Sequence, residues 1–157
     1  MIRNVLFILC LVAVVIGCSS SSNGLSKSAP VENALWKKED ALNMSFEVND
    51  TIRLFDFILN IRHDERYKYS NLYLFVDLHF PNGKVSSDTL ELTLADVAGE
   101  WVGNGGGSLY EVGFKYKDRK KFPFSGLYNI SIRHGMRESE ILGITDVGLS
   151  INNSLSQ

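Results

Sequence analysis

Apolar and polar residues alternate along most of this chain, with the two-residue period of a β-strand. In residues 54–61 every second side chain from Phe55 to Ile61 is apolar. Residues 72–80 repeat the pattern and end at Pro81-Asn82-Gly83, a strong turn signal because proline fixes φ and Asn-Gly tolerates positive φ. Shorter alternating segments follow at 89–94, 110–116, 128–132 and 147–151. The pattern therefore predicts a series of short strands that each bury one face.

Seven or eight such strands, separated by turn signals, predict an all-β fold at this chain length. We expect an antiparallel β-sandwich, of the jelly-roll or immunoglobulin-like kind, in residues 35–157. The pattern leaves the strand order open. One short segment, 136–142, is the only helical candidate.

The longest apolar run lies at the N-terminus, from Val5 to Ile16, where Cys10 is the only interruption. It follows a single positive charge and is too short to span a bilayer as a helix, which is typical of a signal peptide. The run ends at Val15-Ile16-Gly17-Cys18, which resembles the bacterial lipobox except that Ile16 is bulkier than usual. An ordinary signal peptide with a chance cysteine is the alternative, but the serines that follow are typical of a lipoprotein tether.

This resemblance predicts three regions: a signal peptide over 1–17, a lipidated flexible tether over 18–34, and the sandwich over 35–157. In lipobox proteins the cysteine receives a diacylglycerol, the preceding peptide is removed and the new N-terminus is acylated, commonly with palmitate. Two or three acyl chains on Cys18 would hold the protein on a membrane, whereas one chain binds reversibly. Membrane lipid is therefore the first predicted partner.

Composition and motifs narrow the chemistry further. Cleavage before Cys18 leaves no second cysteine, which excludes a disulfide and a cysteine nucleophile in the mature chain. The formal net charge of −2 gives no reason to expect a nucleic-acid partner. His63, His79 and His134 stand in no HExxH or paired spacing, and no serine stands in a GxSxG context. We expect surface or half-buried histidines, no enzyme activity, no cofactor and no metal.

Two segments are candidates for partner binding. The glycine-rich stretch 99–107 lacks the Gly-Lys-Ser/Thr of a phosphate-binding loop, so we expect positive-φ backbone or close approach to a partner. Within it, Trp101 is either an exposed binding anchor beside Asn104 or a core residue. The basic segment 115–121, with Lys120 and Lys121, could touch anionic headgroups or an acidic partner, although a solvated hairpin end is the commoner case.

Several internal motifs, in their order, resemble the gliding-motility lipoprotein H (GldH) family of gliding Bacteroidota. They lie at residues 67–75, 88–90, 94–103, 126–130, 136–137 and 143–149, so the resemblance covers about Trp36 to Ile151. The resemblance implies a non-enzymatic accessory lipoprotein of the cell envelope. Such a protein is needed for gliding and linked to type IX secretion of surface adhesins, with other gliding or secretion envelope proteins as partners.

The same lineage gives two further expectations. Its surface-exported lipoproteins tend to carry acidic residues just after the lipidated cysteine, whereas here none precedes Glu32. We therefore expect an outer-membrane anchor with the chain facing the periplasm. The lineage also glycosylates Asp-Ser/Thr-apolar sites, which makes Thr51 and Thr89 candidates for O-glycosylation.

Two functions from different classes remain open. The first is an envelope adaptor that binds other proteins through exposed loops and edge strands. The second is a lipoprotein that binds a glycan or peptidoglycan fragment on an aromatic platform, for which the candidates are Tyr67, Tyr69, Tyr73 and Trp101. The oligomeric state and the identity of the partner are not specified by the sequence.

Overall fold

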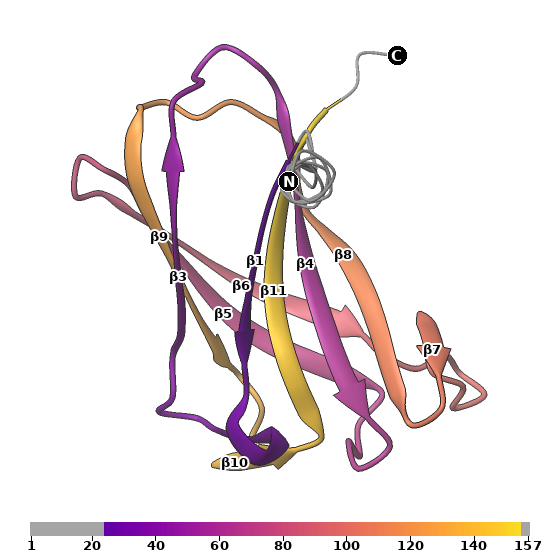
Figure 1. Cartoon of the computed structure of the whole chain (residues 1–157). Coiled ribbons are helices and arrows are strands. Elements are labelled where there is room, and N and C mark those ends of the chain that lie inside the picture. Colours follow the sequence, from indigo (N-terminus) through magenta and orange to yellow (C-terminus); the bar gives the residue numbers. More distant parts are fainter. Residues whose placement is uncertain (1–23, 155–157) are drawn as a thin grey trace, which may run out of the picture.

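The computed structural model describes residues 24–154, so the predicted signal peptide and Cys18 lie outside the described residues. Eleven strands and one 3-10 turn make up this part of the chain (Figure 1). In chain order they are β1 (Gly24–Pro30), η1 (Glu32–Ala34), β2 (Leu35–Lys37), β3 (Leu42–Val48), β4 (Phe55–Asp64), β5 (Asn71–His79), β6 (Val85–Thr93), β7 (Asn104–Gly106), β8 (Leu109–Lys120), β9 (Gly126–His134), β10 (Glu140–Leu142) and β11 (Ile144–Asn153).

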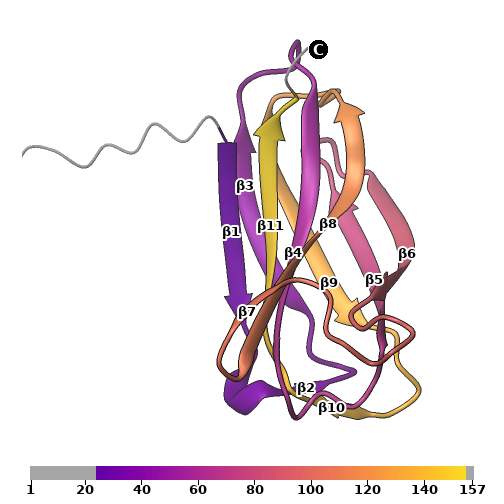
Figure 2. The same ribbon diagram turned by 90° about the vertical axis from the view of Figure 1, so that its right-hand side faces the viewer.

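The strands form two large antiparallel sheets that lie face to face, as the two views show (Figures 1 and 2). The five-stranded sheet has the order β1-β11-β4-β8-β7, and the four-stranded sheet has the order β3-β9-β5-β6. A two-stranded sheet, β10-β2, closes one end of the molecule. The predicted all-β antiparallel sandwich is confirmed.

The core lies between the two sheets and is built by the alternation that the sequence shows. In β4, Leu59 and Ile61 are fully buried, and in β5 every second residue from Leu72 to Leu78 is buried. Each fully buried aliphatic side chain stabilises the fold by about 1.5–3 kcal/mol relative to an exposed one. The strands β4, β5, β9 and β11, each with neighbours on both sides, therefore carry most of the packing.

The strand count exceeds the predicted seven or eight because three strands carry no readable pattern and β1 lies in the predicted tether. The strands β2, β7 and β10 are three residues each, too short to show an alternation. The predicted helical turn at 136–142 is wrong, because β10 lies there and Ile141 pairs with Trp36 of β2. Among residues 24–154 no helix is long and apolar enough to cross a membrane.

The predicted boundary between tether and sandwich also needs correction. Residues 24–30, placed in a flexible tether, form β1 and pair with β11 from Gly24 opposite Asn152 to Pro30 opposite Asp146. The segment is short of large apolar residues, but Leu25 and Ala29 pack against the core from the inner face. Backbone pairing along an existing strand orders such a segment without a strong hydrophobic pattern.

Strand register defines two ends of the sandwich. At the proximal end, where β1 begins, Gly24 pairs with Asn152, Asn152 pairs with Asp56, and the neighbouring Phe55 pairs with Lys120. At the distal end β8 begins, and its residue Leu109 pairs with Asp64 and with Gly106 of β7. Strand β8 has 12 residues, which at about 3.4 Å per residue span roughly 40 Å between the two ends.

Candidate functional site

The segment from Leu94 to Ser108, which we call the Trp101 loop, lies at the distal end and includes β7. Backbone hydrogen bonds fasten its base, since the Leu94 and Ala95 amides both donate to the Ser70 carbonyl at 2.7 and 3.0 Å. The Val102 amide donates to the Leu94 carbonyl at 2.8 Å. The loop is therefore tied to the start of β5, on the other sheet.

A tight turn forms the tip of the first half of this loop. The Asp96 carboxylate accepts hydrogen bonds from the backbone amides of Ala98 and Glu100 at 2.8 and 2.9 Å. The turn leaves Val97 fully exposed to solvent. An apolar side chain that projects from a locally fixed turn is a surface that a partner can bury.

The sequence predicted either positive-φ backbone or close approach to a partner for the glycines of this loop. Gly99, Gly103 and Gly107 have positive φ, so the predicted left-handed backbone is confirmed. Close approach is also present, but within the chain: a Cβ on Gly105 would lie 2.6 Å from a ring carbon of Tyr110. A side chain there would displace the Tyr110 ring or open the β7–β8 hairpin.

Trp101 is a packing residue of this loop rather than an exposed anchor. It is half-buried, its ring meets the His63 ring edge to face at 4.5 Å, and it lies 5.9 Å from the Tyr110 ring. Tyr110 stacks on His63 at 5.4 Å, so the three rings form one cluster. Of the two roles left open for Trp101, the packed one is closer to the structure, and the outward surface of the loop belongs to Val97, Val102 and Asn104.

The histidines differ from the surface or half-buried positions expected of them. His63 and His134 are completely buried, while His79 is exposed. Burial lowers the pKa of both buried imidazoles, and for His134 the charge of Lys38 lowers it further. A neutral imidazole packs as an aromatic ring, and His134 accordingly meets Trp36 edge to face at 5.4 Å. Among residues 24–154 no group of His, Cys, Asp or Glu is arranged to hold a metal ion.

The basic segment lies at the opposite end of β8 from the Trp101 loop. Two of its lysines are paired, Lys115 with Asp118 at 2.8 Å and Lys117 with Asp88 at 2.9 Å. Lys120 and Lys121 are exposed and take part in no ion pair within residues 24–154. The structure therefore does not join Trp101 and Asn104 with Lys120 and Lys121 in one site.

The two candidate glycosylation sites have different surroundings. Thr51 is half-buried in the turn after β3, where the Asp50 carboxylate accepts from the amides of Ile52 and Arg53. Hydrogen bonds from Arg53 lower the pKa of Asp50 to about 2. Thr89 is exposed on the edge strand β6, and the preceding Asp88 accepts a hydrogen bond from the Tyr116 hydroxyl at 2.5 Å.

The four aromatic residues proposed as a glycan platform do not share a surface. Tyr67 is buried, and its hydroxyl donates to the Asn71 carbonyl at 2.7 Å, which satisfies it inside the fold. Tyr69 packs edge-on against Tyr67, whereas Tyr73 faces solvent from the four-stranded sheet. With Trp101 packed on His63, no aromatic platform is formed by these four side chains.

Comparison with known proteins gives the family. The model of the family described as GldH lipoprotein matches residues 25–151. A gliding motility lipoprotein GldH homolog of Christiangramia forsetii is 40% identical over 126 residues, which are 76% of this chain and 78% of that protein. The gliding motility lipoprotein GldH of Flavobacterium johnsoniae is 32% identical over 123 residues, 74% of this chain and 76% of that protein.

A solved structure of a carbohydrate-binding module specific for non-crystalline cellulose is also similar. It has 14% identity and a TM-score of 0.41, and the match covers 87% of this chain and 75% of that one. A likeness at this level carries no argument about ligand. The family match and the two relatives each span about three quarters or more of the chain, and the chain therefore belongs to the GldH lipoprotein family of gliding-motility lipoproteins.

Proposed function

We propose that this chain is a non-enzymatic adaptor of the bacterial cell envelope. In this role it is an accessory component of gliding, linked to type IX secretion of surface adhesins, and acyl chains on Cys18 hold it on the membrane. Membership of a gliding-motility lipoprotein family supports the process. The placement of the two ends of the sandwich supports the adaptor role.

The observation that carries the proposal is the separation between the start of β1 and the Trp101 loop. Gly24, six residues after Cys18, lies at the proximal end, and the loop lies at the distal end. Six residues reach at most about 20 Å, whereas β8 alone extends roughly 40 Å between the ends. An anchor at Cys18 would therefore keep the proximal end near the bilayer and present the loop away from it.

The charge distribution is consistent with this orientation. Lys120 and Lys121 lie at the proximal end, three strands away from Gly24 in the same sheet. A lysine or arginine near an anionic membrane surface gains about 1 kcal/mol of attraction. The basic segment would thus assist the lipid anchor rather than form part of the partner surface.

The distal surface offers two means of binding a protein. Val97 and Val102 expose apolar surface on a loop that is fixed by backbone hydrogen bonds and by the packing of Trp101. Beside them, β7 is the edge of the five-stranded sheet, and an edge strand can pair with an extended segment of a partner. Asn104, exposed on β7, adds a polar group to this surface.

Gliding of cells that carry altered copies tests the adaptor proposal. Val97→Asp combined with Val102→Asp should abolish or strongly reduce gliding, because two charges would oppose burial of the loop, while the abundance of the lipoprotein stays unchanged. Val85→Asp is the matched control, since Val85 is an exposed valine on β6 of the other sheet. Normal gliding of the double variant would show that the loop is the wrong surface.

The location and the modification are proposals of the same kind. The lack of acidic residues between Cys18 and Glu32 favours an outer-membrane protein that faces the periplasm. Degradation of the protein by protease added to intact cells would contradict that orientation. Glycosylation at Thr51 or Thr89 predicts a mass in excess of the lipidated chain, and an intact mass without that excess would rule it out.

A further inference from the structure

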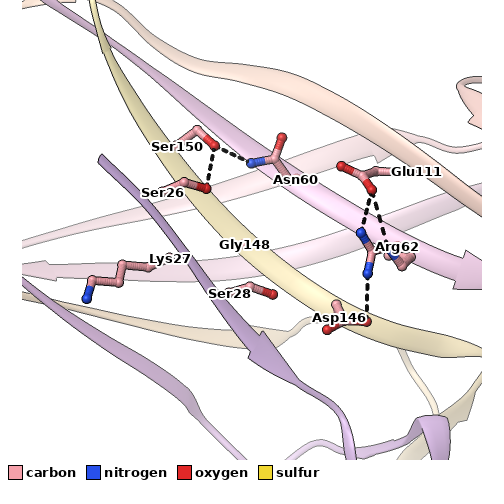
Figure 3. Close-up of a pocket in the computed structure, with 9 residues that line it drawn as sticks. All are labelled: Ser26, Lys27, Ser28, Asn60, Arg62, Glu111, Asp146, Gly148 and Ser150. Carbon is pink, nitrogen blue, oxygen red and sulfur yellow. Dashed lines mark hydrogen bonds and ion pairs between the residues drawn. The ribbon is translucent and has the colours of Figure 1, made fainter. Parts of the chain in front are cut away.

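A polar hollow lies on the outer face of the five-stranded sheet, across β1, β11, β4 and β8 (Figure 3). Its volume is about 200 Å³. The side chains around it carry hydroxyl, amide, guanidinium and carboxylate groups, and the principal ones are Ser26, Asn60, Arg62, Glu111, Asp146 and Ser150. None of its lining residues belongs to the Trp101 loop or to the basic segment, although Glu111 at its edge pairs with Asn104 of β7.

Gly148 creates the depth of this hollow. Along β11 it stands between Asp146 and Ser150 with the same alternation, so a side chain at this position would project from the outer face into the hollow. A Cβ there would lie 3.0 Å from the Lys27 carbonyl oxygen and 3.5 Å from Cβ of Asn60. Because Gly148 has no side chain, a recess is left in the middle of a sheet face that is otherwise lined with side chains.

The polar groups around the recess are held in place by one another. The Asn60 amide donates to the Ser150 hydroxyl at 2.7 Å, and that hydroxyl lies 3.2 Å from the Ser26 hydroxyl. On the other side Arg62 donates to the Glu111 carboxylate at 2.7 Å, with Asp146 at 3.8 Å (Figure 3). The Ser26–Ser150–Asn60 side is built from short side chains on rigid strands, which form a more ordered site than long surface chains do.

The chemistry of the lining selects the class of ligand. Arg62 is already paired with Glu111 and lies 3.8 Å from Asp146, so no free positive charge favours a phosphate. No group of His, Cys, Asp or Glu within residues 24–154 is arranged to hold a metal ion. Hydroxyl and amide groups both donate and accept, which matches a ligand whose own groups do the same. The hollow has room for roughly seven water volumes of about 30 Å³ each, which is the scale of one sugar ring.

We propose that this hollow binds a single residue of a neutral glycan, with the Ser26–Ser150–Asn60 group and the Arg62–Glu111 pair as hydrogen-bonding partners for its hydroxyls. This proposal does not rest on the adaptor role, since none of the hollow's lining residues belongs to the Trp101 loop. It places sugar recognition on the sheet face, without the aromatic residues that the sequence suggested. A small ligand of this size, held mainly by hydrogen bonds, binds with a Kd on the order of 1–10 mM.

Titration by nuclear magnetic resonance tests the proposal on the full-length lipoprotein in detergent micelles. Glucose, galactose and N-acetylglucosamine are added separately, and at least one should shift the backbone amides of Ser26, Asn60, Gly148 and Ser150. Ser150→Val should weaken this binding about tenfold, because it removes the hydroxyl that both Asn60 and Ser26 contact. Ser45→Val is the matched control, since the Ser45 hydroxyl is also bonded to an asparagine, donating to Asn129 on the outer face of the other sheet.

Three results would overturn the proposal. They are no shift at the hollow with any of the three sugars, equal binding by Ser150→Val, and shifts confined to the other sheet around Tyr73. If Ser150→Val fails to fold, Glu111→Met provides the second test, because that side chain is exposed and its carboxylate borders the hollow. Binding by Glu111→Met that is as tight as that of the unaltered chain would count against the proposed site. Loss of sugar binding would leave the adaptor proposal untouched.

Discussion

At the scale of single residues, the two buried histidines should make the stability of the fold depend on pH. His63 and His134 are inside the protein as neutral rings, and burial lowers the pKa of each. In the unfolded chain both return to a pKa of about 6.5. Below that pH the unfolded state binds more protons than the folded state, so acidification must reduce the free energy of unfolding.

We predict a loss of up to about 1.4 kcal/mol per pH unit for each buried histidine as the pH falls from 6.5 towards the folded-state pKa. Urea unfolding at pH 7.5 and pH 5.5 measures it. His63→Phe should reduce this slope, since phenylalanine keeps a ring against Trp101 and Tyr110 but binds no proton. His79→Gln, at an exposed position, is the control for the loss of a histidine as such. An identical slope in His63→Phe would contradict the assignment.

Sequence reasoning at this scale found residues with unusual composition but not their neighbours. It selected Trp101 and the glycines around it, and positive φ at Gly103 followed from glycine itself. It did not find that His63, almost forty residues earlier in the chain, is the residue on which Trp101 rests. Contacts between distant segments depend on strand register, and a local pattern carries no information about which strands pair.

At the scale of elements, the strands that the sequence predicted are those in which apolar and polar residues alternate over many positions and turn residues mark the ends. Strands β4, β5 and β9 were recognisable because their inward residues are large and aliphatic or aromatic. Strand β1 was not, because only Leu25 and Ala29 face inward and the exposed Lys27 shares their side of the strand. A lysine on the inner side of an edge strand also disfavours pairing of that strand with a strand of another molecule.

The assignment of β1 to the fold predicts a stability effect that a flexible tether would not show. Leu25→Ala should lower the free energy of unfolding by about 1–2 kcal/mol, less than the 2–5 kcal/mol of a fully buried leucine because Leu25 is half-buried. Ser28→Ala, on the exposed side of the same strand, should change it by less than about 0.5 kcal/mol. Thermal or urea unfolding of the two variants measures the difference. If Leu25→Ala and Ser28→Ala had the same free energy of unfolding, residues 24–30 would belong to the flexible tether and not to the fold.

At the scale of the whole molecule, the proposed function assigns one end of the sandwich to the membrane and the other end to a partner. Gly24 and the lysines at the end of β8 share the proximal end, while the Trp101 loop and β7 share the distal end. The sequence predicted an anchor, a basic segment and a candidate loop as separate features. Their arrangement along one long axis became visible only through the register of β1, β11, β4 and β8 (Figure 2).

The orientation predicts different distances of the two ends from the bilayer. Cysteines at position 121 or position 104 would be the only free thiols of the mature chain, since Cys18 would be acylated. With the lipoprotein anchored in vesicles that carry a headgroup quencher, a fluorophore at position 121 should be quenched. A fluorophore at position 104, which lies opposite Glu111 and hence roughly 34 Å farther away along the strand, should not be. Equal quenching at both positions would show that the long axis lies along the membrane.

The central claim is that the distal loop contacts another envelope protein, and crosslinking in living, gliding cells tests it most directly. A photoreactive amino acid is placed at Val97, with Val85 on the other sheet as the matched exposed position. The adaptor role predicts that position 97 captures one or a few envelope proteins reproducibly, that position 85 does not, and that Val102→Asp removes the crosslink. Capture of the same proteins from both positions, or of none from position 97 in cells that glide normally, would contradict it.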